Sequence, residues 1–482
     1  MKRGRSDGDA ENGDDSVDTR RVKQRADARS RFPEYSAPAS AAISIIVGSV
    51  PAYAPTFTHQ QFSGEIIWGY SSPQLVLSYT DPDLRFSGTF RADGLYTESN
   101  AAGVGSTLTP DDIAECVRTS LPTSAPLHVH IGKCAMAPQA YFPATDAHEI
   151  TSLTIPPGRR VAAYCDAKTG RDFVIHTWAL DDPALRAYHD RMATLAMWAI
   201  ETASPIDVDD PRWSVFGLYE VGHGTSFSFA GYATVYRFTN PMRRARPTSL
   251  RLAQLFVLPR YQRHGHGRHI LEAVHAAATV EDAFEVTVEA PCEGMSRLRD
   301  ARDVGEAARR GLLPMLWDGG DCSAASPPAA APLRELPPPL NPEALEALRL
   351  ELRCTLSQAR RVVEALTLAR LPVRAAAVAE SSSSGSDGAL FTAYRVAVKR
   401  RMYATDEDVR AVTDAAARKA VLEDMFLDAH AEYAAALGAN GLIPAAEAQR
   451  IVSERAAAVA AAEAAEAAAA AAKAPSDDDS EA

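Results

Sequence analysis

The sequence predicts an α+β fold, with an N-terminal α+β domain, a central sheet flanked by helices and a C-terminal helical domain. Apolar and polar residues alternate in several segments between residues 57 and 155, which is typical of strands. An amphipathic helix follows, and three strand-like runs then lead to a glycine turn that opens another helix. Beyond residue 342 the pattern is helical.

Individual elements follow from these patterns. In the N-terminal domain we expect strands at Leu75–Tyr79 and Leu127–Ile131, with turns at Asp81-Pro82-Asp83 and Asp93-Gly94. The amphipathic helix spans Pro183–Thr202, and Asp181 or Asp182 can cap its start. Central strands are expected at Ser214–Tyr219, Phe229–Phe238, Leu252–Leu258 and Phe284–Glu289. C-terminal helices are expected at Glu343–Leu352, Ser357–Arg370 (N-capped by Ser357) and Leu390–Tyr403.

Composition suggests the domain boundaries. We expect a disordered tail at 1–30, domains at 31–160 and 161–317, a linker at 318–342, a helical domain at 343–455 and an alanine-rich acidic tail at 456–482. Residues 36–56 are interpreted as an inserted loop, 380–388 as a flexible insertion, and the segment from Ala456 as an exposed, partly frayed helix. Basic residues near Lys2 and Arg20 fit either a nuclear import signal or an ordinary charged tail.

Charge and cysteine usage exclude some classes of protein. The net charge of −12 over 482 residues argues against general nucleic-acid binding and favours a basic substrate. The six cysteines form no Cys-x-x-Cys pair, so neither a zinc site nor a disulfide framework is expected. No apolar run approaches the roughly 20 residues that cross a bilayer. We therefore expect a soluble intracellular protein.

The segment Leu255–His275 is the most informative part of the chain. An apolar run ends in a loop with Gly265 and Gly267, and a helix begins there. Unpaired N–H groups and the helix dipole suit such a turn to hold a phosphate, and Arg263 and Arg268 add positive charge. A tight strand–helix turn without a ligand fits the pattern equally well.

Two glutamates are candidates for a general base. Glu289 ends the strand that follows the glycine turn, and partial desolvation there raises a carboxyl pKa towards neutrality. A solvated glutamate at a strand end is the simpler interpretation. Glu201, at the end of the amphipathic helix, is the second candidate, and simple surface exposure is its alternative.

Other side chains near these segments suggest a binding site for a basic peptide. Asp207, Asp209 and Asp210 can line an acidic entrance, and aromatic residues can contact lysine methylenes. The aromatic candidates are Trp213, which is also a plausible core residue, Tyr232 and Tyr236. His264 and His266 suggest a metal site, but no further ligands stand at useful spacing, so we interpret them as loop residues and expect no metal. Cys292 is a weak candidate for an acyl-accepting nucleophile, because no His and carboxylate are placed so as to reveal a catalytic triad.

The turn resembles the pyrophosphate loop of the GCN5-related N-acetyltransferases, Gln/Arg-x-x-Gly-x-Gly/Ala, through Gln262, Gly265 and Gly267. Longer stretches resemble the catalytic subunits of type B histone acetyltransferases. The most specific are Ile200–Trp213, Tyr261–His275 and Thr287–Asp300; Gly231–Tyr236, Gln358–Val362 and Tyr394–Arg401 accompany them. The resemblance covers about 30–403 apart from the insertions.

This resemblance implies a mixed, mostly antiparallel acetyltransferase sheet within 161–317 and acetyl transfer from acetyl-CoA to lysines of newly made histone H4. Glu289 is then the general base and Glu201 assists it. The implied acetyl-CoA contacts are Leu255, Phe256 and Val257 along the strand and Gln262, Arg263, His264, Gly265, His266, Gly267 and Arg268 in the turn. The implied histone contacts are Glu65, Trp213, Tyr236, Arg237 and Phe238.

Family membership further implies a complex with histones H4 and H3 and with a WD40-repeat histone-binding protein of the retinoblastoma-binding type. It implies residence in nucleus and cytoplasm, with no direct contact to nucleic acid or membrane. The chain departs from the family pattern at Ala290, where an Asp is usual, at Arg263, where animal members have Gly, and at Pro205, where an aromatic is usual. Two alternatives remain: a non-catalytic acetyl-CoA-binding histone scaffold, and an acetyltransferase for other amines.

Overall fold

The structure is a computed structural model that describes residues 30–97, 109–122, 126–132, 155–222, 224, 226–312, 333, 342–374 and 386–473. The chain divides into two compact units, Met1–Phe238 with Arg251–Val274, and Thr239–Leu250 with His275–Ala482. The predicted N-terminal tail and import signal, most of the 318–342 linker and the acidic C-terminus lie outside the described residues. The predicted domain boundaries remain predictions.

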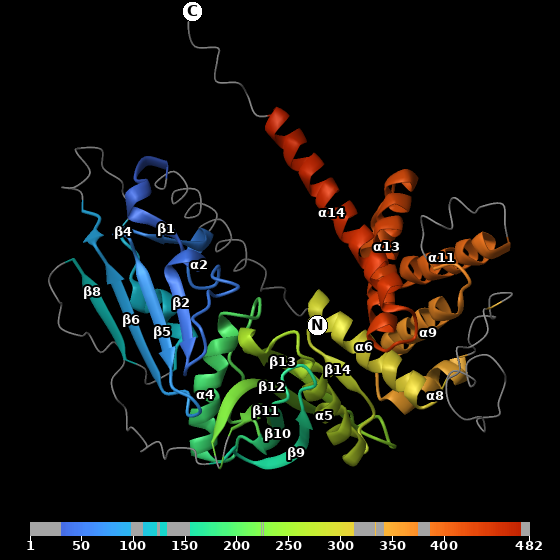
Figure 1. Cartoon of the computed structure of the whole chain (residues 1–482), viewed down its shortest axis with the longest axis horizontal. Coiled ribbons are helices and arrows are strands. Elements are labelled where there is room, and N and C mark those ends of the chain that lie inside the picture. Colours follow the sequence, from blue (N-terminus) through green and yellow to red (C-terminus); the bar gives the residue numbers. More distant parts are fainter. Residues whose placement is uncertain are drawn as a thin grey trace, which may run out of the picture. The chain divides into compact units, whose positions relative to one another are not determined.

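A mixed four-stranded sheet occupies the N-terminal part of the first unit (Figure 1). β2 and β5 are parallel, β5 and β6 antiparallel, and β6 and β8 parallel. Its strands are β2 (Ile43–Val47), β5 (Gln74–Tyr79), β6 (Phe86–Ala92) and β8 (Leu127–Ile131). Shorter elements accompany it: η1 (Pro33–Tyr35), β1 (Ser36–Pro38), α2 (Ala39–Ala42), η2 (Ser63–Glu65), β3 (Ile66–Trp68), β4 (Tyr70–Ser71), β7 (Gly94–Leu95), α3 (Ile113–Val117) and η3 (Arg118–Ser120).

The prediction of an inserted loop at 36–56 is wrong. β2 lies within it and pairs in parallel with β5, from Ile43 opposite Leu75 to Val47 opposite Tyr79. Ile43 and Ile45 are fully buried, whereas the intervening Ser44 is only partly so. The short Ile-Ser-Ile alternation therefore predicts strand β2 correctly, whereas the loop-like composition of the flanking alanines, serines and prolines does not.

A six-stranded sheet follows in the order β14-β13-β12-β11-β10-β9. β9 to β12 form successive antiparallel pairs, and the β11–β12 pair agrees with the mostly antiparallel sheet that the resemblance implies. The strands are β9 (Arg159–Cys165), β10 (Asp172–Ala179), β11 (Trp213–Val221), β12 (Phe227–Thr239), β13 (Thr248–Val257) and β14 (Val286–Val288). β13 contributes Thr248–Leu250 to the second unit and the remainder to the first. The α+β prediction is confirmed, although β9 and β10 were not predicted.

Two helices in this region agree with the predicted patterns. α4 (Pro183–Met197) is capped by Asp182, whose carboxylate accepts the N–H of Ala184 at 2.8 Å. It ends five residues before the predicted Thr202, so Glu201 lies in the turn that follows the helix. α5 (His266–Val280) begins at the glycine turn after η4 (Pro259–Tyr261) and buries the predicted face of Ile270, Leu271 and Val274.

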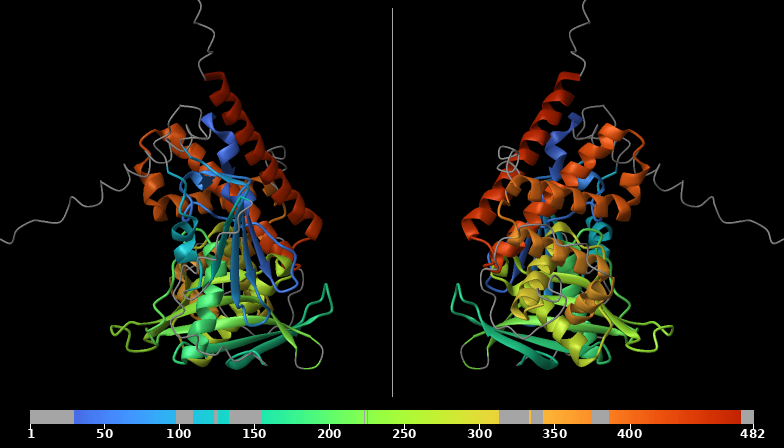
Figure 2. Two further views of the ribbon diagram at one scale, coloured as in Figure 1. Left: turned by 90° about the vertical axis from the view of Figure 1, so that its left-hand side faces the viewer. Right: turned by 90° about the vertical axis from the view of Figure 1, so that its right-hand side faces the viewer.

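The second unit is mainly helical, and its core includes Val304, Leu352, Val362, Phe391 and Phe426. The longest pair, α13 and α14, lies side by side (Figure 2). Its helices are α6 (Glu293–Arg309), α8 (Pro342–Leu352), α9 (Leu356–Arg370), α11 (Ser386–Thr405), α12 (Glu407–Ala411), α13 (Ala415–Ala439) and α14 (Ala445–Lys473). Helices α6, α12 and α13 were not predicted.

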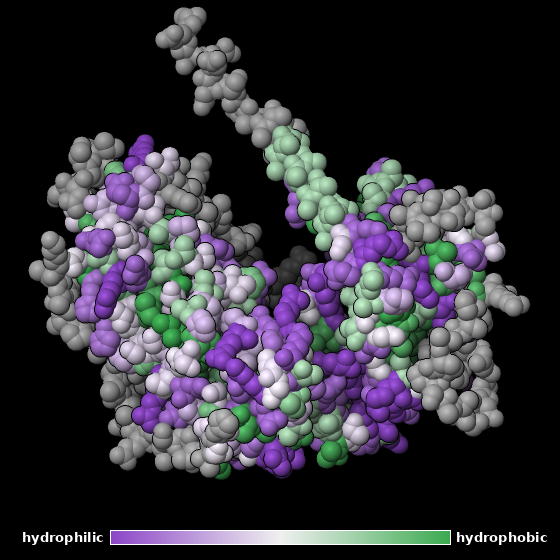
Figure 3. Space-filling model, viewed as in Figure 1, coloured by the Kyte–Doolittle hydropathy of each residue, from purple (hydrophilic) through white to green (hydrophobic). Residues whose placement is uncertain are grey.

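Several predicted details of this unit need correction. Thr355 rather than Ser357 caps α9, because its hydroxyl accepts the N–H of Gln358. Residues 386–388 of the predicted insertion are helical, and 380–385 lie outside the described residues. The exposed alanine helix is confirmed as the outer part of α14, pale green in Figure 3.

Among the described residues, none of the helices combines the length and apolar character needed to span a bilayer. The four cysteines in the described part of the chain, Cys116, Cys165, Cys292 and Cys354, form no disulfide bonds.

Candidate functional site

The turn after β13 is held by its own side chains. Gln262 Nε2 donates a 2.9 Å hydrogen bond to the carbonyl of Val257, which closes the loop between strand end and helix. The N–H of Leu258 donates to the carbonyl of Ala230 on β12, also at 2.9 Å. These bonds fix the direction in which the chain leaves the sheet. Gln262 therefore shapes the turn, in addition to any contact with a ligand.

The backbone of the turn is open towards solvent. Arg263 and Gly265 have φ of +65° and +85°, and no atom lies within 4 Å of the position that a Gly265 Cβ would take. The N–H of His269 donates to the carbonyl of Gly265 at 3.2 Å and so begins the backbone hydrogen bonding of the helix. The preceding N–H groups, including that of Gly267, stand at the start of a 15-residue helix, where they attract anions.

A second turn, between β9 and β10, supports the glycine turn. Lys168 Nζ donates to the carbonyl of Arg263 at 2.6 Å, and His264 Nδ1 donates to Asp166 Oδ2 at 2.9 Å. The hydroxyl of Tyr164 shares a 2.7 Å hydrogen bond with Nδ1 of His266. We call Tyr164, Asp166 and Lys168 the bracing residues. Sequence reasoning missed them because β9 was not predicted.

The environment fixes the charge of two of these groups. Hydrogen bonds from the Thr169 hydroxyl (2.6 Å), the Lys168 N–H (3.0 Å) and His264 hold the pKa of Asp166 well below its ordinary value. Burial lowers the pKa of His266 from 6.5 to about 4. At neutral pH Asp166 is therefore an anion and His266 a neutral imidazole. His264 lies in the loop, as we interpreted it, whereas His266 is the first residue of α5.

Strands β12 and β13 approach each other closely next to this turn. A Cβ on Gly231 would lie 2.5 Å from the carbonyl oxygen of Phe256 and 3.0 Å from Cα of Val257. The register between β11 and β12 shifts beside it, so that Ala230 is an extra residue in β12. Phe256 and Val257 are buried and Leu255 half-buried. Gly231 is thus needed for the backbone geometry of the predicted cofactor strand.

The two candidate bases are solvent-exposed. Glu289 follows β14, which is joined to β13 by the N–H of Phe284 to Thr248 (2.7 Å) and the N–H of Leu250 to Glu285 (3.0 Å). The partial desolvation expected for Glu289 is absent in this structure. Glu201 is also exposed.

The predicted acceptor residues Trp213 and Tyr236 meet across β11 and β12. They are register partners, with ring centroids 4.8 Å apart. The Tyr236 hydroxyl donates to Asp210 at 2.9 Å, and the guanidinium of Arg212 covers the Tyr236 ring at 4.8 Å. Phe238 is 38% exposed, and Arg251 stacks on it at 4.3 Å.

The predicted acidic entrance is partly neutralised by this chain. Asp209 pairs with Arg186 at 2.5 Å, and Asp210 with Arg212 at 2.6 Å. Glu65, the remaining predicted histone contact, is exposed and lies 4.0 Å from Nδ1 of His59. Arg237 is half-buried.

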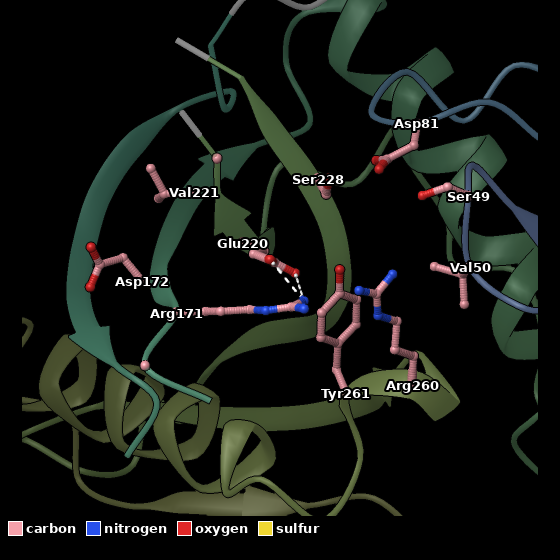
Figure 4. A pocket seen from close by; sticks show the side chains of 12 residues that line it. Ser49, Val50, Asp81, Arg171, Asp172, Glu220, Val221, Ser228, Arg260 and Tyr261 are labelled. Atoms are coloured by element: carbon pink, nitrogen blue, oxygen red, sulfur yellow. Dashed lines mark hydrogen bonds and ion pairs between the residues drawn. The ribbon is translucent and has the colours of Figure 1, made fainter. Parts of the chain in front are cut away.

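Two neighbouring cavities in the first unit share Arg171, Arg260 and Tyr261 as lining residues. The larger, about 580 Å³, reaches Ser49 and Asp81 (Figure 4). Arg171 pairs there with Glu220 at 3.1 Å, and burial raises the pKa of Asp81. The smaller, about 150 Å³, is lined by Asp166, His264 and His266 among others.

Comparison with known proteins identifies the class of enzyme to which the chain is similar. The family model described as "Histone acetyl transferase HAT1 N-terminus" matches residues 36–201. A "Histone acetyltransferase type B catalytic subunit" from Mycosarcoma maydis is 26% identical over 410 residues, which cover 82% of this chain and 85% of the relative. The protein is an acetyltransferase enzyme, as the resemblance implied.

Among acetyltransferases, the chain is similar to the catalytic subunits of type B histone acetyltransferases, and the resemblance found in the sequence is confirmed. Proteins of that name from Aspergillus fumigatus and Homo sapiens are 34% and 28% identical. The alignments cover 31% of this chain and 31% of the Aspergillus relative, and 58% of this chain and 66% of the human one.

Solved structures that align with the chain include two acetyltransferases. One is an aminoglycoside acetyltransferase from an uncultured soil metagenomic sample, with a TM-score of 0.20 and 18% identity over 25% of this chain and 78% of that one. The other is a ribosomal-protein-alanine N-acetyltransferase from Brucella melitensis, with a TM-score of 0.17 and 14% identity over 25% and 82%. Scores this low support no inference about this chain.

Proposed function

We propose that the protein transfers acetyl groups from acetyl-CoA to lysines of the tail of newly synthesised histone H4. The observation that carries this proposal is the open glycine turn at the N-terminus of α5, in a chain similar to type B histone acetyltransferase catalytic subunits. The turn supports acetyl-CoA as the acetyl donor, and the similarity to these subunits supports a histone lysine as the acetyl acceptor. The proposal goes beyond acetyl transfer as such, because it names the histone, the base and the mechanism.

The turn has the groups that a diphosphate needs. Gly265 leaves its surface open, and the N–H groups from His264 to Gly267 precede the hydrogen-bonded body of α5. Arg263 adds positive charge, Arg268 is paired with Glu272 at 2.9 Å, and Lys168 is bound to the carbonyl of Arg263. The backbone of Leu255–Val257 then holds the pantetheine arm, and Gln262 maintains the turn from Val257. These residues fit acetyl-CoA as the co-substrate.

In the proposed mechanism the lysine amine attacks the acetyl carbonyl directly within a ternary complex, the carbon–sulfur bond of the thioester then breaks, and coenzyme A leaves as a thiolate that takes up a proton from solvent. Acetyl-CoA supplies an activated thioester. Glu289 accepts the proton of the incoming ammonium, directly or through water, and Glu201 assists; a backbone N–H of β13 donates to the developing oxyanion. Because Glu289 is exposed in the free chain, we propose that the bound substrates remove water from it.

The acceptor side is proposed to consist of Glu65, Trp213, Tyr236, Arg237 and Phe238. The rings of Trp213, Tyr236 and Phe238 form one aromatic row, since successive centroids are 4.8 and 4.6 Å apart. Such a row suits the methylenes of lysine-rich peptides. Arg212 and Arg251 lie over two of these rings and must be displaced for a lysine to stack there.

We further propose that the chain works with histone H3–H4 and with a WD40-repeat histone-binding protein of the retinoblastoma-binding type, in both nucleus and cytoplasm. Support comes from the family resemblance alone. Co-purification with tagged histone H4, followed by identification of bound proteins, tests the partners. Fractionation of cells that express the native chain tests the location.

The substrate is tested by incubating the full chain with acetyl-CoA and three acceptors: an H4 tail peptide, a polyamine and a peptide with only a free N-terminal amine. Mass spectrometry then locates the acetyl groups. We expect kcat/KM for the H4 peptide to be at least tenfold above the others. Equal or greater activity on the polyamine or the N-terminal amine contradicts the proposal.

A histone-binding scaffold that retains acetyl-CoA binding is the second candidate. It is favoured by the exposure of Glu289 and by Ala290, which has a φ of +36° and stands where the family pattern of the resemblance has an Asp. If the wild-type chain binds acetyl-CoA and H4 peptide but transfers no acetyl group, the scaffold is the correct function.

A further inference from the structure

Three ligand-type side chains meet beneath the glycine turn. One ring nitrogen from each of His264 and His266 and one carboxylate oxygen of Asp166 all lie within 4.8 Å of one another. Asp166 and His266 are only 4% and 2% exposed, so this is not a chance gathering of surface side chains. They come from two segments about 100 residues apart, the β9–β10 turn and the start of α5.

We infer that Asp166, His264 and His266 form a binding site for a divalent transition-metal ion of the zinc type. Imidazole nitrogens and a carboxylate are the donors that such ions accept, at about 2.0–2.1 Å. Tetrahedral ligands at that distance lie roughly 3.4 Å apart. Movements on the order of 1–1.5 Å, within reach of side-chain rotation, bring the three donors to that spacing. Water completes the coordination.

The groups around these side chains are arranged as outer ligands usually are. Thr169 and the N–H of Lys168 orient the carboxylate of Asp166. The Tyr164 hydroxyl engages Nδ1 of His266 and leaves Nε2 for the ion. Such second contacts fix the direction and tautomer of metal ligands. Bound metal would replace the hydrogen bond between His264 and Asp166, with the ring proton of His264 moving to Nε2.

The surroundings provide both space and compensated charge. The cavity of about 150 Å³ that these three side chains line has room for an ion and a water molecule. Two arginines, Arg171 and Arg260, also line the cavity, and the charge of Arg171 is balanced by Glu220. An ion here would add positive charge beside the proposed diphosphate site.

Direct metal binding tests this inference without any acetyltransferase assay. Untagged full-length chain, stripped with a chelator, is titrated with Zn²⁺ by calorimetry and with Co²⁺ by visible absorption, in the absence of acetyl-CoA and histone. We expect one ion per chain and a tetrahedral Co²⁺ spectrum without a thiolate band. His264→Ala, which alters a half-exposed ligand, should weaken binding at least ~100-fold.

Cys165→Ser is the matched control, because this exposed thiol directly precedes Asp166 and offers an alternative explanation for zinc binding. We expect it to bind as the wild type does. Asp166→Asn keeps the shape of the side chain and should lose affinity with an unchanged circular dichroism spectrum. Absence of 1:1 binding, unchanged affinity in His264→Ala, or loss of binding in Cys165→Ser overturns the inference, and none of these results bears on acetyl transfer.

Discussion

Lys168 Nζ donates a 2.6 Å hydrogen bond to the backbone carbonyl of Arg263 and so joins two turns that lie 95 residues apart in the sequence. Arg263 has a positive φ of +65°, which its side chain disfavours. The lysine therefore stabilises a strained peptide in the segment that we propose to bind diphosphate.

Loss of this contact should loosen the turn without touching the reacting atoms. For Lys168→Ala we expect the KM for acetyl-CoA to rise about three- to tenfold with kcat nearly unchanged, the range of one hydrogen bond. Steady-state kinetics measures both constants. Lys419→Ala, an exposed lysine of α13, is the control. A fall in kcat with constant KM contradicts the bracing role.

Gly265 is predicted to be required for its backbone. At a φ of +85°, an alanine is strained even though the space around it is open. Gly265→Ala should weaken acetyl-CoA binding at least tenfold in a calorimetric titration, because the N–H groups around it shift. Gly441→Ala, with a φ of +67° and equally open surroundings, is strained in the same way outside the turn. If both variants bind acetyl-CoA normally, the turn is not the diphosphate site.

The buried imidazole of His266 makes stability depend on pH. Its pKa falls from 6.5 to about 4 on folding, so the unfolded chain binds more protons between these values. The stabilisation is complete above pH 6.5 and declines by on the order of 3 kcal/mol as pH approaches 4. Urea unfolding followed by tryptophan fluorescence should show that the free energy of unfolding falls less between these pH values in His266→Asn than in the wild type. The substitution His59→Asn, at an exposed histidine, serves as the control. If the free energy of unfolding depends on pH equally in the wild type, His266→Asn and His59→Asn, His266 is not the cause of the pH dependence.

We predict that Arg212 competes with the proposed histone substrate for Tyr236 and Asp210. Its guanidinium lies over the ring and pairs with the carboxylate. Arg212→Ala should therefore lower the KM for an H4 tail peptide about two- to fivefold, as expected for one exposed cation–π contact. Arg118→Ala removes an exposed arginine that pairs with Glu115, and it should have no effect. An unchanged KM in Arg212→Ala shows that the aromatic row does not bind the acceptor.

Local patterns were sufficient for much of the fold. The strands around Leu75 and Leu127, the central strands β11 to β13, the cap at Asp182 and the apolar face of α5 follow from alternation, turn residues and helical spacing. β2 was missed because its pairing with β5 overrides a composition typical of loops. α13 was missed because its alanines give little contrast between its faces.

The candidate site was predictable only in part. Glycine spacing located the turn, because the backbone conformation there depends on the residues themselves. Tyr164, Asp166 and Lys168 could not be foreseen, since β9 and its turn come close to His264 only through sheet pairing. Ion pairing of Asp209 and Asp210 depends on side-chain positions that the sequence does not specify.

The central claim is that Glu289 accepts the proton of the attacking amine. Single-turnover acetylation of an H4 tail peptide by Glu289→Gln, with acetyl-CoA binding measured in parallel, tests it most directly. We predict a rate at least ~100-fold lower than wild type with unchanged acetyl-CoA affinity, the range for loss of a general base. A rate within about twofold of wild type contradicts the claim.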